Sequence, residues 1–315
     1  MRALVIAVLL IFPRALMAQL QLPDLTENAT GYVENPIIGN QVRIRFDAGF
    51  DDRFPDRAEF FYGKCGCFRI LGLDPEAPGP GPGIVTSLRF QEYTGDFEYA
   101  LKPRFSVLAT IPFRAIQPTD FVPAGGPEVF PNHFGFGDLR LGLKAAIYAD
   151  ENHYVSFQFK SYLPTGNAED GLGTDHVSLE PAVLVNRKIN DRAALSGQAG
   201  FWIPIHGSSR APLDDGRYAG NIFSYGFALS YGLSGMDAPV RVTPVVEFMG
   251  WNVMSGSATT TTGIADASGT NIFNIKAGVR LAFRTTDSIY TGYGHQLTNA
   301  GWYNDMLRLE YRHAF

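Results

Sequence analysis

Cysteine is scarce in this chain of 315 residues, which contains only two. Cys65 and Cys67 flank a single glycine, and no nearby histidine or third cysteine completes the ligand set of a metal site. We therefore expect no metal and no cofactor. If the chain is exported into an oxidising compartment, Cys65 and Cys67 are candidates for a local disulfide, or they remain a pair of surface thiols.

Long apolar runs are also lacking, apart from one at the N-terminus. Residues 3–12 are uniformly apolar, and the small residues Ala15 and Ala18 offer a cleavage site shortly afterwards. The run is too short to cross a bilayer comfortably as a helix, so it predicts a signal peptide at residues 1–18, cleaved after about Ala18. No later stretch has the apolar length of a transmembrane helix. We expect an exported protein that is not a helical membrane protein.

Charge is sparse and slightly acidic. Asp, Glu, Lys and Arg make up 18% of the residues, and 31 acidic residues against 26 basic ones give a formal net charge of −5. An acidic chain does not favour nucleic acid, so we expect no nucleic-acid partner. No Pro/Ser-rich linker divides the chain. We expect an irregular N-terminal lead-in on the periplasmic side at residues 19–38, followed by one β domain at residues 39–315.

Alternating apolar and polar residues fill most of that domain. Every second residue from 139 to 147 is apolar, and the positions between them include Arg140 and Lys144. Residues 153–163 repeat the pattern after a short turn at 149–152. Successive strand side chains point to opposite faces, so each arm has an apolar face and a charged face. The two arms predict a β-hairpin.

Recurrence of this pattern predicts an all-β fold, a transmembrane antiparallel up-and-down barrel of about 12 strands. Short and long connections alternate, and the longest is an external insert at residues 51–83 that carries the cysteine pair. Even strand number and sorted loops are typical of bacterial outer-membrane barrels with periplasmic termini. Phe315 shares a face with Leu309 and Tyr311, which resembles the terminal signal recognised by the outer-membrane assembly machinery. We predict location in the bacterial outer membrane, in contact with its lipid.

Three positions interrupt the regular pattern. The apolar phase of residues 85–101 changes near Tyr93-Thr-Gly95, which predicts a β-bulge. Pro181 and Pro244 fall inside predicted strands, where proline removes a donor from the hydrogen-bond ladder. We expect bulges or register breaks at both prolines.

The polar faces of the strands predict the lining of a pore. The candidates are Arg43, Arg45, Arg140, Lys144, Lys160, Glu180, Arg241, Glu247, Lys276, Arg280, Arg308, Glu310 and Arg312. On this assignment about ten basic groups face about five acidic ones, and a basic wall attracts anions. We therefore expect a preference for small organic anions such as aromatic or fatty acids. The alternative is that these charges pair across a narrow lumen and fill it.

Three short motifs resemble those of a known family. They are Gly135-Phe-Gly-Asp-Leu-Arg-Leu-Gly-Leu-Lys144, Leu163-Pro-Thr-Gly166 and Leu172-Gly-Thr-Asp175. They are similar to those of exported bacterial proteins named for the meta-pathway of phenol degradation, regarded as outer-membrane transporter-like barrels. The resemblance covers about residues 85–315 and implies a small aromatic cargo. The cysteine-bearing insert does not belong to the pattern.

Three functions fit these observations. The first is a porin-like channel or transporter for small molecules, and the second is a structural or adhesive barrel with a plugged lumen. The third is a lipase-like outer-membrane enzyme that uses His176, Ser178 and Asn186 or Asn190. His176 and Ser178 share the polar face with Glu180, whereas a lipase acting on membrane lipid needs an outward site. We expect a channel and no enzyme.

Overall fold

The computed structural model describes residues 28–53, 84–122, 132–167, 170–174, 176–205, 220–235, 238–260, 263–283, 286–299 and 303–315. The expected signal peptide with its cleavage position, and the insert with Cys65 and Cys67 except for its first three residues, lie outside the described residues. Within them, no helix is long and apolar enough to cross a membrane, which is a finding about helices alone.

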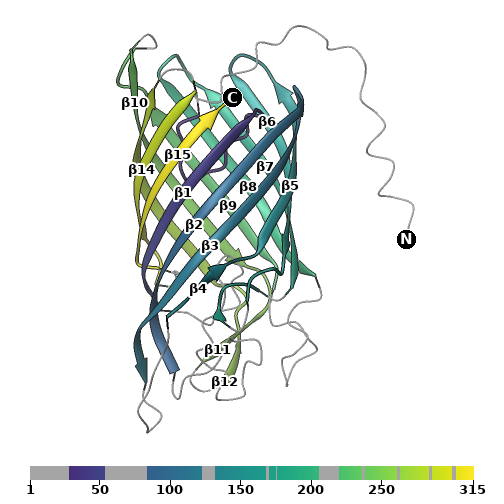
Figure 1. Cartoon of the computed structure of the whole chain (residues 1–315), viewed down its shortest axis with the longest axis vertical. Coiled ribbons are helices and arrows are strands. Elements are labelled where there is room, and N and C mark those ends of the chain that lie inside the picture. Colours follow the sequence, from purple (N-terminus) through teal and green to yellow (C-terminus); the bar gives the residue numbers. More distant parts are fainter. Residues whose placement is uncertain are drawn as a thin grey trace, which may run out of the picture.

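The described residues form a closed antiparallel barrel of twelve strands, which confirms the predicted fold (Figure 1). The barrel strands are β1 Gln41–Asp52, β2 Ile84–Lys102, β3 Phe105–Val122, β5 Leu139–Ala149, β6 His153–Leu163, β7 Val177–Lys188, β8 Ala193–Ile205, β9 Ile222–Tyr231, β10 Val240–Val253, β13 Asn271–Phe283, β14 Asp287–Gln296 and β15 Asp305–Ala314. Strand β4, His133–Phe136, continues the line of β5 along β3. Strands β11, Ser257–Thr260, and β12, Gly263–Asp266, form a separate hairpin. The ring closes because β1 pairs with both β2 and β15.

The connections are sorted by length between the two ends of the barrel. At the end that holds the C-terminus, the strands are joined by residues 103–104, 150–152, 189–192, 232–239 and 284–286. We call this the short-turn end. The opposite, long-loop end carries the β11–β12 hairpin and the longer connections (Figure 1). This sorting agrees with the expectation from the sequence and is typical of outer-membrane barrels.

The outer face of the barrel is apolar, as the two-residue period predicts. Leu141, Phe157 and Leu309 remain 40% to 51% exposed although they lie in the middle of their strands. Neighbouring aromatic side chains also stack on this surface, and the ring centroids of Phe227 and Phe248 are 4.7 Å apart. A barrel wall that exposes apolar side chains around its circumference is suited to lipid.

Replacing Phe157 by arginine is expected to lower the free energy of unfolding from a lipid bilayer by about 2–4 kcal/mol, because a charge near the midplane must leave water. Urea titration of the protein folded into vesicles measures the change. Glu151→Arg, in the exposed turn that precedes β6, is the control and should alter stability little. Equal losses in the two variants would show that Phe157 does not face lipid.

Strand β2 corrects one expectation. Its pairing with β1 runs unbroken from Gln41↔Glu98 to Gly49↔Phe90, so the bulge expected near Tyr93-Thr-Gly95 is wrong. The facing of the side chains is constant from Leu88 to Tyr99, and Leu88 and Phe90 are apolar residues that point into the barrel, where both are buried. The inward face of β2 is therefore apolar near the long-loop end and charged further along the strand.

The expected breaks at the two prolines are also wrong. Pro181 pairs with Phe159, and the register between β7 and β8 is the same on either side of it. Pro244 pairs with Val279 in an unbroken ladder, and the ladder to β9 begins one residue later. Each proline is accommodated by a local gap in pairing without an inserted residue.

The three sequence motifs meet at the break between β4 and β5. The Asp138 carboxylate accepts hydrogen bonds from the Gly166 N–H (3.0 Å) and from the N–H and hydroxyl of Thr174 (2.9 and 2.8 Å). A Cβ on Gly173 would lie 2.6 Å from Asp138 Oδ1, so this close approach requires glycine. The motifs thus fold the connection after β6 onto the barrel rim.

Candidate functional site: the occupied lumen

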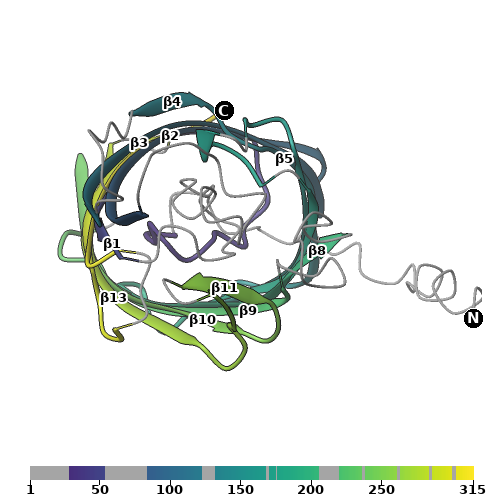
Figure 2. The ribbon, with the colours of Figure 1, turned by 90° about the horizontal axis from the view of Figure 1, so that it is seen from below.

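A segment of the chain itself occupies the lumen. The sequence predicts a periplasmic lead-in at residues 19–38, but its described part, residues 28–38, lies inside the ring of strands (Figure 2). We call residues 28–38 the luminal segment. Its apolar side chains are buried, and Ile37 is only 1% exposed. Its backbone polar groups find partners on the inward faces of the strands, which gives an irregular segment an ordered place.

Glu247 on β10 binds the tip of the luminal segment. Its carboxylate accepts hydrogen bonds from three consecutive backbone N–H groups, those of Gly31 (2.9 Å), Tyr32 (2.9 Å) and Val33 (2.7 Å). Tyr290 adds its hydroxyl at 3.2 Å. Glu247 is completely buried. A buried carboxylate is tolerated when its oxygens are satisfied in this way, so Glu247 and the segment depend on each other.

Three arginines bind carbonyl groups of the same segment. Arg280 donates to Ala29 O (3.1 Å) and Thr30 O (2.7 Å), and Arg312 donates to Asn28 O (3.2 Å). Arg308 donates to Gly31 O. Carboxylates orient these guanidinium groups. Glu310 Oε1 lies 2.7 Å from Arg280 and 3.1 Å from Arg312, and Asp47 binds Arg308 through two bonds of 2.6 and 2.7 Å.

The side of the segment nearest β6 is held by ion pairs. Glu34 Oε1 lies 2.8 Å from Lys160 Nζ, and Arg43 lies 3.6 Å from the other carboxylate oxygen. Burial raises the pKa of Glu34, but the charges of Lys160 and Arg43 outweigh it and hold that pKa well below its usual range. Lys144 donates to Asn35 O at 2.9 Å. Glu34 therefore stays charged at neutral pH.

Aromatic rings surround the ammonium group of Lys276. Its Nζ lies 3.8 Å from the ring centroid of Tyr32, 5.6 Å from that of Tyr303 and 5.8 Å from that of Trp251. The guanidinium carbon of Arg308 also lies over the Tyr32 ring, 4.0 Å from its centroid. Cation–π contacts of this kind attach Tyr32 to the wall through its ring as well as its backbone.

Three of the remaining candidates from the sequence contact other residues of the barrel wall. Arg45 pairs with Asp47 at 3.3 Å, and Arg140 pairs with Glu92 at 3.6 Å. Glu180 accepts a hydrogen bond from the Tyr162 hydroxyl. Arg241 lies near the short-turn end, in the wall of a separate cavity.

Acidic residues that the sequence analysis missed remove the expected surplus of positive charge. Because the phase of β2 is continuous, Glu92, Asp96 and Glu98 all point inward and are buried. Among the described residues, the buried charged side chains are nine acidic and six basic: Asp47, Asp52, Glu92, Asp96, Glu98, Asp138, Glu180, Glu247 and Glu310 against Arg45, Arg114, Lys144, Lys276, Arg280 and Arg312. Arg43, Arg140, Lys160 and Arg308 also pair inside the lumen although they are slightly more exposed, and so does Glu34. With them, these described charged groups number ten of each sign, so a two-to-one basic excess is not found among them. The charges pair with each other and with the luminal segment.

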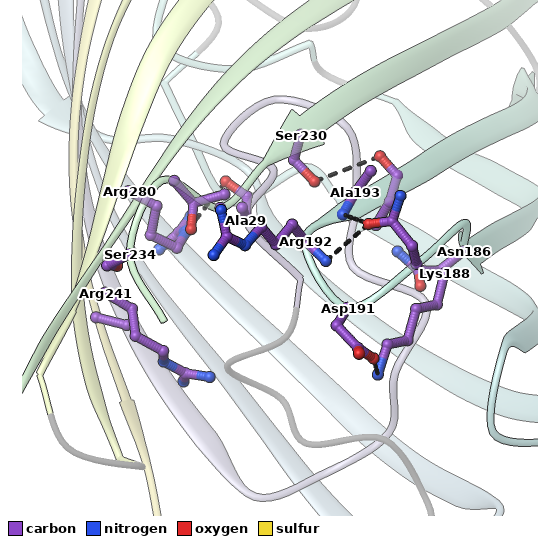
Figure 3. Close-up of a pocket in the computed structure, with 15 residues that line it drawn as sticks. Ala29, Asn186, Lys188, Asp191, Arg192, Ala193, Ser230, Ser234, Arg241 and Arg280 are labelled. Atoms are coloured by element: carbon purple, nitrogen blue, oxygen red, sulfur yellow. Dashed lines mark hydrogen bonds and ion pairs between the residues drawn. The ribbon is translucent and has the colours of Figure 1, made fainter. Parts of the chain in front are cut away.

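Cavities lie on both sides of the luminal segment. One, of about 780 Å³ including its solvent-open part, is lined by Tyr32 and Glu34 of the segment together with Trp251 and Tyr303. The other cavity, of about 740 Å³ with its solvent-open part included, lies at the short-turn end and reaches Ala29 (Figure 3). The segment is the element of the described chain that stands between them.

The residues of the lipase hypothesis do not form an outward site. His176 Nδ1 and Ser178 Oγ are 3.0 Å apart, but both residues are buried inside the barrel. Asn186 instead donates to Ser196 at 2.9 Å. Among the described residues, no group of three or more His, Cys, Asp or Glu side chains is placed to hold a metal ion.

An apolar wall, a charged interior and a segment of the same chain within the lumen define a β-barrel of the outer-membrane type. The chain belongs to the family described as "Putative MetA-pathway of phenol degradation", whose model matches residues 84–302. This confirms the resemblance seen in the motifs. No curated protein matches the chain.

Two of the solved structures that match the chain are an outer-membrane channel and an autotransporter domain. An outer membrane channel from Pseudomonas putida F1 is 13% identical, with a TM-score of 0.54, and the match covers 91% of this chain and 99% of that one. The beta domain of a Bordetella autotransporter is 12% identical, with a TM-score of 0.48, and the match covers 88% of this chain and all of that one. At 13% sequence identity, the similarity to the Pseudomonas putida channel shows a shared barrel fold and nothing more.

Proposed function

We propose that the protein is an outer-membrane channel for small molecules, closed by its luminal segment. One observation carries the proposal: the cavities on either side of residues 28–38 are separated by a segment held through polar contacts. Such contacts can be exchanged for water when the segment moves, whereas an apolar core would resist wetting. The short-turn end faces the periplasm in this proposal, because short periplasmic turns are typical of these barrels.

The cargo we propose is a small organic molecule, with aromatic compounds included. The family name supports aromatic cargo, and so do the rings of Tyr162, Trp251 and Tyr303 in the wall of the larger cavity. The balance of buried acidic and basic groups removes the basis for an anion preference. Shape and aromatic contact would then select the solute more than its charge.

Solute uptake by proteoliposomes tests this function. The matched control is a variant whose luminal segment can be locked to the wall by a disulfide. It carries Asn28→Cys and Ser196→Cys, because the side chains of Asn28 and Ser196 are 3.4 Å apart. Cys65 and Cys67 are replaced by serine in this variant. Liposomes with the reduced variant or the wild type should swell in small solutes, and oxidation should stop the swelling of the variant. If reduced and wild-type proteins never admit solute, the barrel is a structural one with a permanently plugged lumen.

We also propose that residues 1–18 are a cleaved signal peptide and that the assembly machinery recognises Phe315, which ends the chain beside β15. Deleting Phe315 should reduce heat-modifiable, membrane-inserted protein while export to the periplasm continues. Fractionation of cells followed by gel-shift analysis measures both quantities. Normal insertion of the shortened chain would contradict the role of Phe315.

A further inference from the structure

A cluster of polar side chains lies on the outer face of the barrel at the short-turn end, where β5, β6 and β7 are neighbours (Figure 1). The Asp150 carboxylate accepts a hydrogen bond from the Tyr148 hydroxyl at 2.7 Å, and His153 Nδ1 lies 3.1 Å from it. The backbone N–H groups of Asn152 and His153 also donate to this carboxylate, at 2.8 and 2.6 Å. The bond from Tyr148, together with these, holds the pKa of Asp150 below its usual range. A negative charge therefore persists at this end of the outer wall.

A bulge in β5 places Tyr148 in this cluster. The register between β5 and β6 shifts between Ala146 and Tyr148, so Ile147 and Tyr148 both face outward, at 51% and 52% exposure. A β-bulge re-aims side chains in this way. With regular alternation Tyr148 would point into the lumen, and its hydroxyl would not reach Asp150. The contact between Tyr148 and Asp150 thus depends on a local departure from regular strand pairing.

Arg187 on β7 stands next to the cluster. It pairs with His153 across the ladder between β6 and β7, and Cβ atoms of directly opposite residues are about 4.5–5.5 Å apart. Arg187 is exposed, and within the described part of the chain its guanidinium group makes no ion pair or hydrogen bond. The outer wall therefore presents a carboxylate and a guanidinium group on either side of an imidazole. We call Tyr148, Asp150, His153 and Arg187 the headgroup patch.

Apolar side chains cover the wall between the headgroup patch and the middle of the barrel. Along β7 the outward residues are Val183 and Val185, exposed by 42% and 39%, and then Arg187. On β6, Val155 lies opposite Val185, and His153 follows at the level of Arg187. The outward face thus changes from apolar to polar at the same level on neighbouring strands. This level is the edge of the apolar band, where lipid headgroups begin.

We propose that the headgroup patch binds one phospholipid whose headgroup carries both a phosphate and a primary ammonium, as in phosphatidylethanolamine. Arg187 donates charge-assisted hydrogen bonds to the phosphate. The ammonium donates to the Asp150 carboxylate beside the ring of Tyr148, which favours a cation. One acyl chain lies along Val155 and Val185. The site belongs to the outer wall alone, so it stands whether or not the barrel conducts.

A second cluster at the same end of the barrel supplies a matched control. Asp287 accepts a hydrogen bond from the Tyr311 hydroxyl at 2.6 Å and lies 2.8 Å from His313 Nδ1. The residue opposite His313 on the next strand is Val42, where the headgroup patch has an arginine. The second cluster has the carboxylate, the imidazole and the aromatic hydroxyl but no guanidinium group at that ladder position. It should not select a headgroup that carries a phosphate.

Native mass spectrometry of the purified full-length protein, titrated with lipids that have identical acyl chains, tests the site. We expect one phosphatidylethanolamine to bind in preference to phosphatidylcholine, whose ammonium has no N–H to donate, and to phosphatidylglycerol, which has no ammonium. Arg187→Gln and Asp150→Asn should each weaken this binding by about three- to tenfold, because one charged contact is lost at a partly exposed site. Asp287→Asn should leave it unchanged.

A measurement on the wild type avoids any folding defect of the variants. Phosphatidylethanolamine that carries a photoreactive group in its acyl chain, close to the glycerol, should label the wall around Ile147 and Val185. It should not label the wall around Ile289, which lies beside the second cluster. Equal labelling of the two regions, equal binding of the three lipids, or equally tight binding of glycerophosphoethanolamine, which has no acyl chains, would each overturn the proposed lipid site.

Discussion

A protein that lacks residues 28–38 is expected to conduct ions almost continuously in a planar bilayer, whereas the full-length protein opens rarely. The luminal segment fills the space between two cavities and supplies backbone hydrogen-bond partners to Glu247 and Arg280. Without it, water enters and hydrates Glu247 and Arg280, so the buried charges do not remain unpaired. The barrel itself persists, because its strand pairing does not involve the segment.

Replacing residues 28–38 by a glycine–serine chain of equal length is the control for this experiment. Such a chain keeps the spacing before β1 but lacks Tyr32 and Glu34, and Gly/Ser-rich segments behave as flexible coils. It should give frequent, noisy openings that fall between those of the deletion and the wild type. If the deletion variant folds, inserts and still does not conduct, the luminal segment is not what closes the barrel.

The strands and the outer wall could be predicted from the sequence because one physical rule governs them. Lipid-facing positions must be apolar, so residues such as Phe157 and Leu309 repeat with a period of two. Turns at the short-turn end are brief and polar, which marks the strand ends. These signals are local, and they do not depend on what lies inside the barrel.

The inner face could not be predicted as well because its residues respond to partners distant in sequence. Leu88 and Phe90 are inward and apolar because that part of the lumen is packed, and Phe90 contacts Tyr303 at a ring-centroid distance of 6.3 Å. Read by polarity alone, these residues belong to the outer face. That assignment produced a false bulge and hid Glu92, Asp96 and Glu98 from the charge count.

The luminal segment itself left a weak signal in the sequence. Residues 28–38 show no period, and their order comes from contacts with residues more than a hundred positions away, such as Glu247 and Arg280. The apolar residues Tyr32, Val33, Ile37 and Ile38 within this irregular stretch were the available hint. The basic residues assigned to an anion pathway largely bind this segment and its neighbouring carboxylates.

Replacing Glu247 by glutamine is expected to raise the open fraction of the channel by roughly 30- to 150-fold, because docking of the luminal segment loses about 2–3 kcal/mol. The carboxylate accepts three N–H bonds from residues 31–33 and one from Tyr290. Glutamine is nearly the same size but has only one side-chain oxygen that can accept these hydrogen bonds. Its NH₂ group is a donor, so it cannot accept a hydrogen bond from the backbone N–H groups that it faces. Single-channel recording of open probability measures the effect.

Glu180→Gln is the control, because Glu180 is a buried carboxylate of the same lumen whose hydrogen bond comes from Tyr162 and not from the segment. Its open probability should stay close to that of the wild type. Gly31→Ala approaches the same contact from the segment side: an added Cβ would lie 2.2 Å from the Tyr290 ring, so the tip must withdraw from Glu247. Gly31→Ala and Glu247→Gln should therefore open the channel similarly, and the double variant should add little to either one. Additive effects, or an equal effect of Glu180→Gln, would contradict this role. Glu247 would then stabilise the barrel wall and would not hold the luminal segment in the closed position.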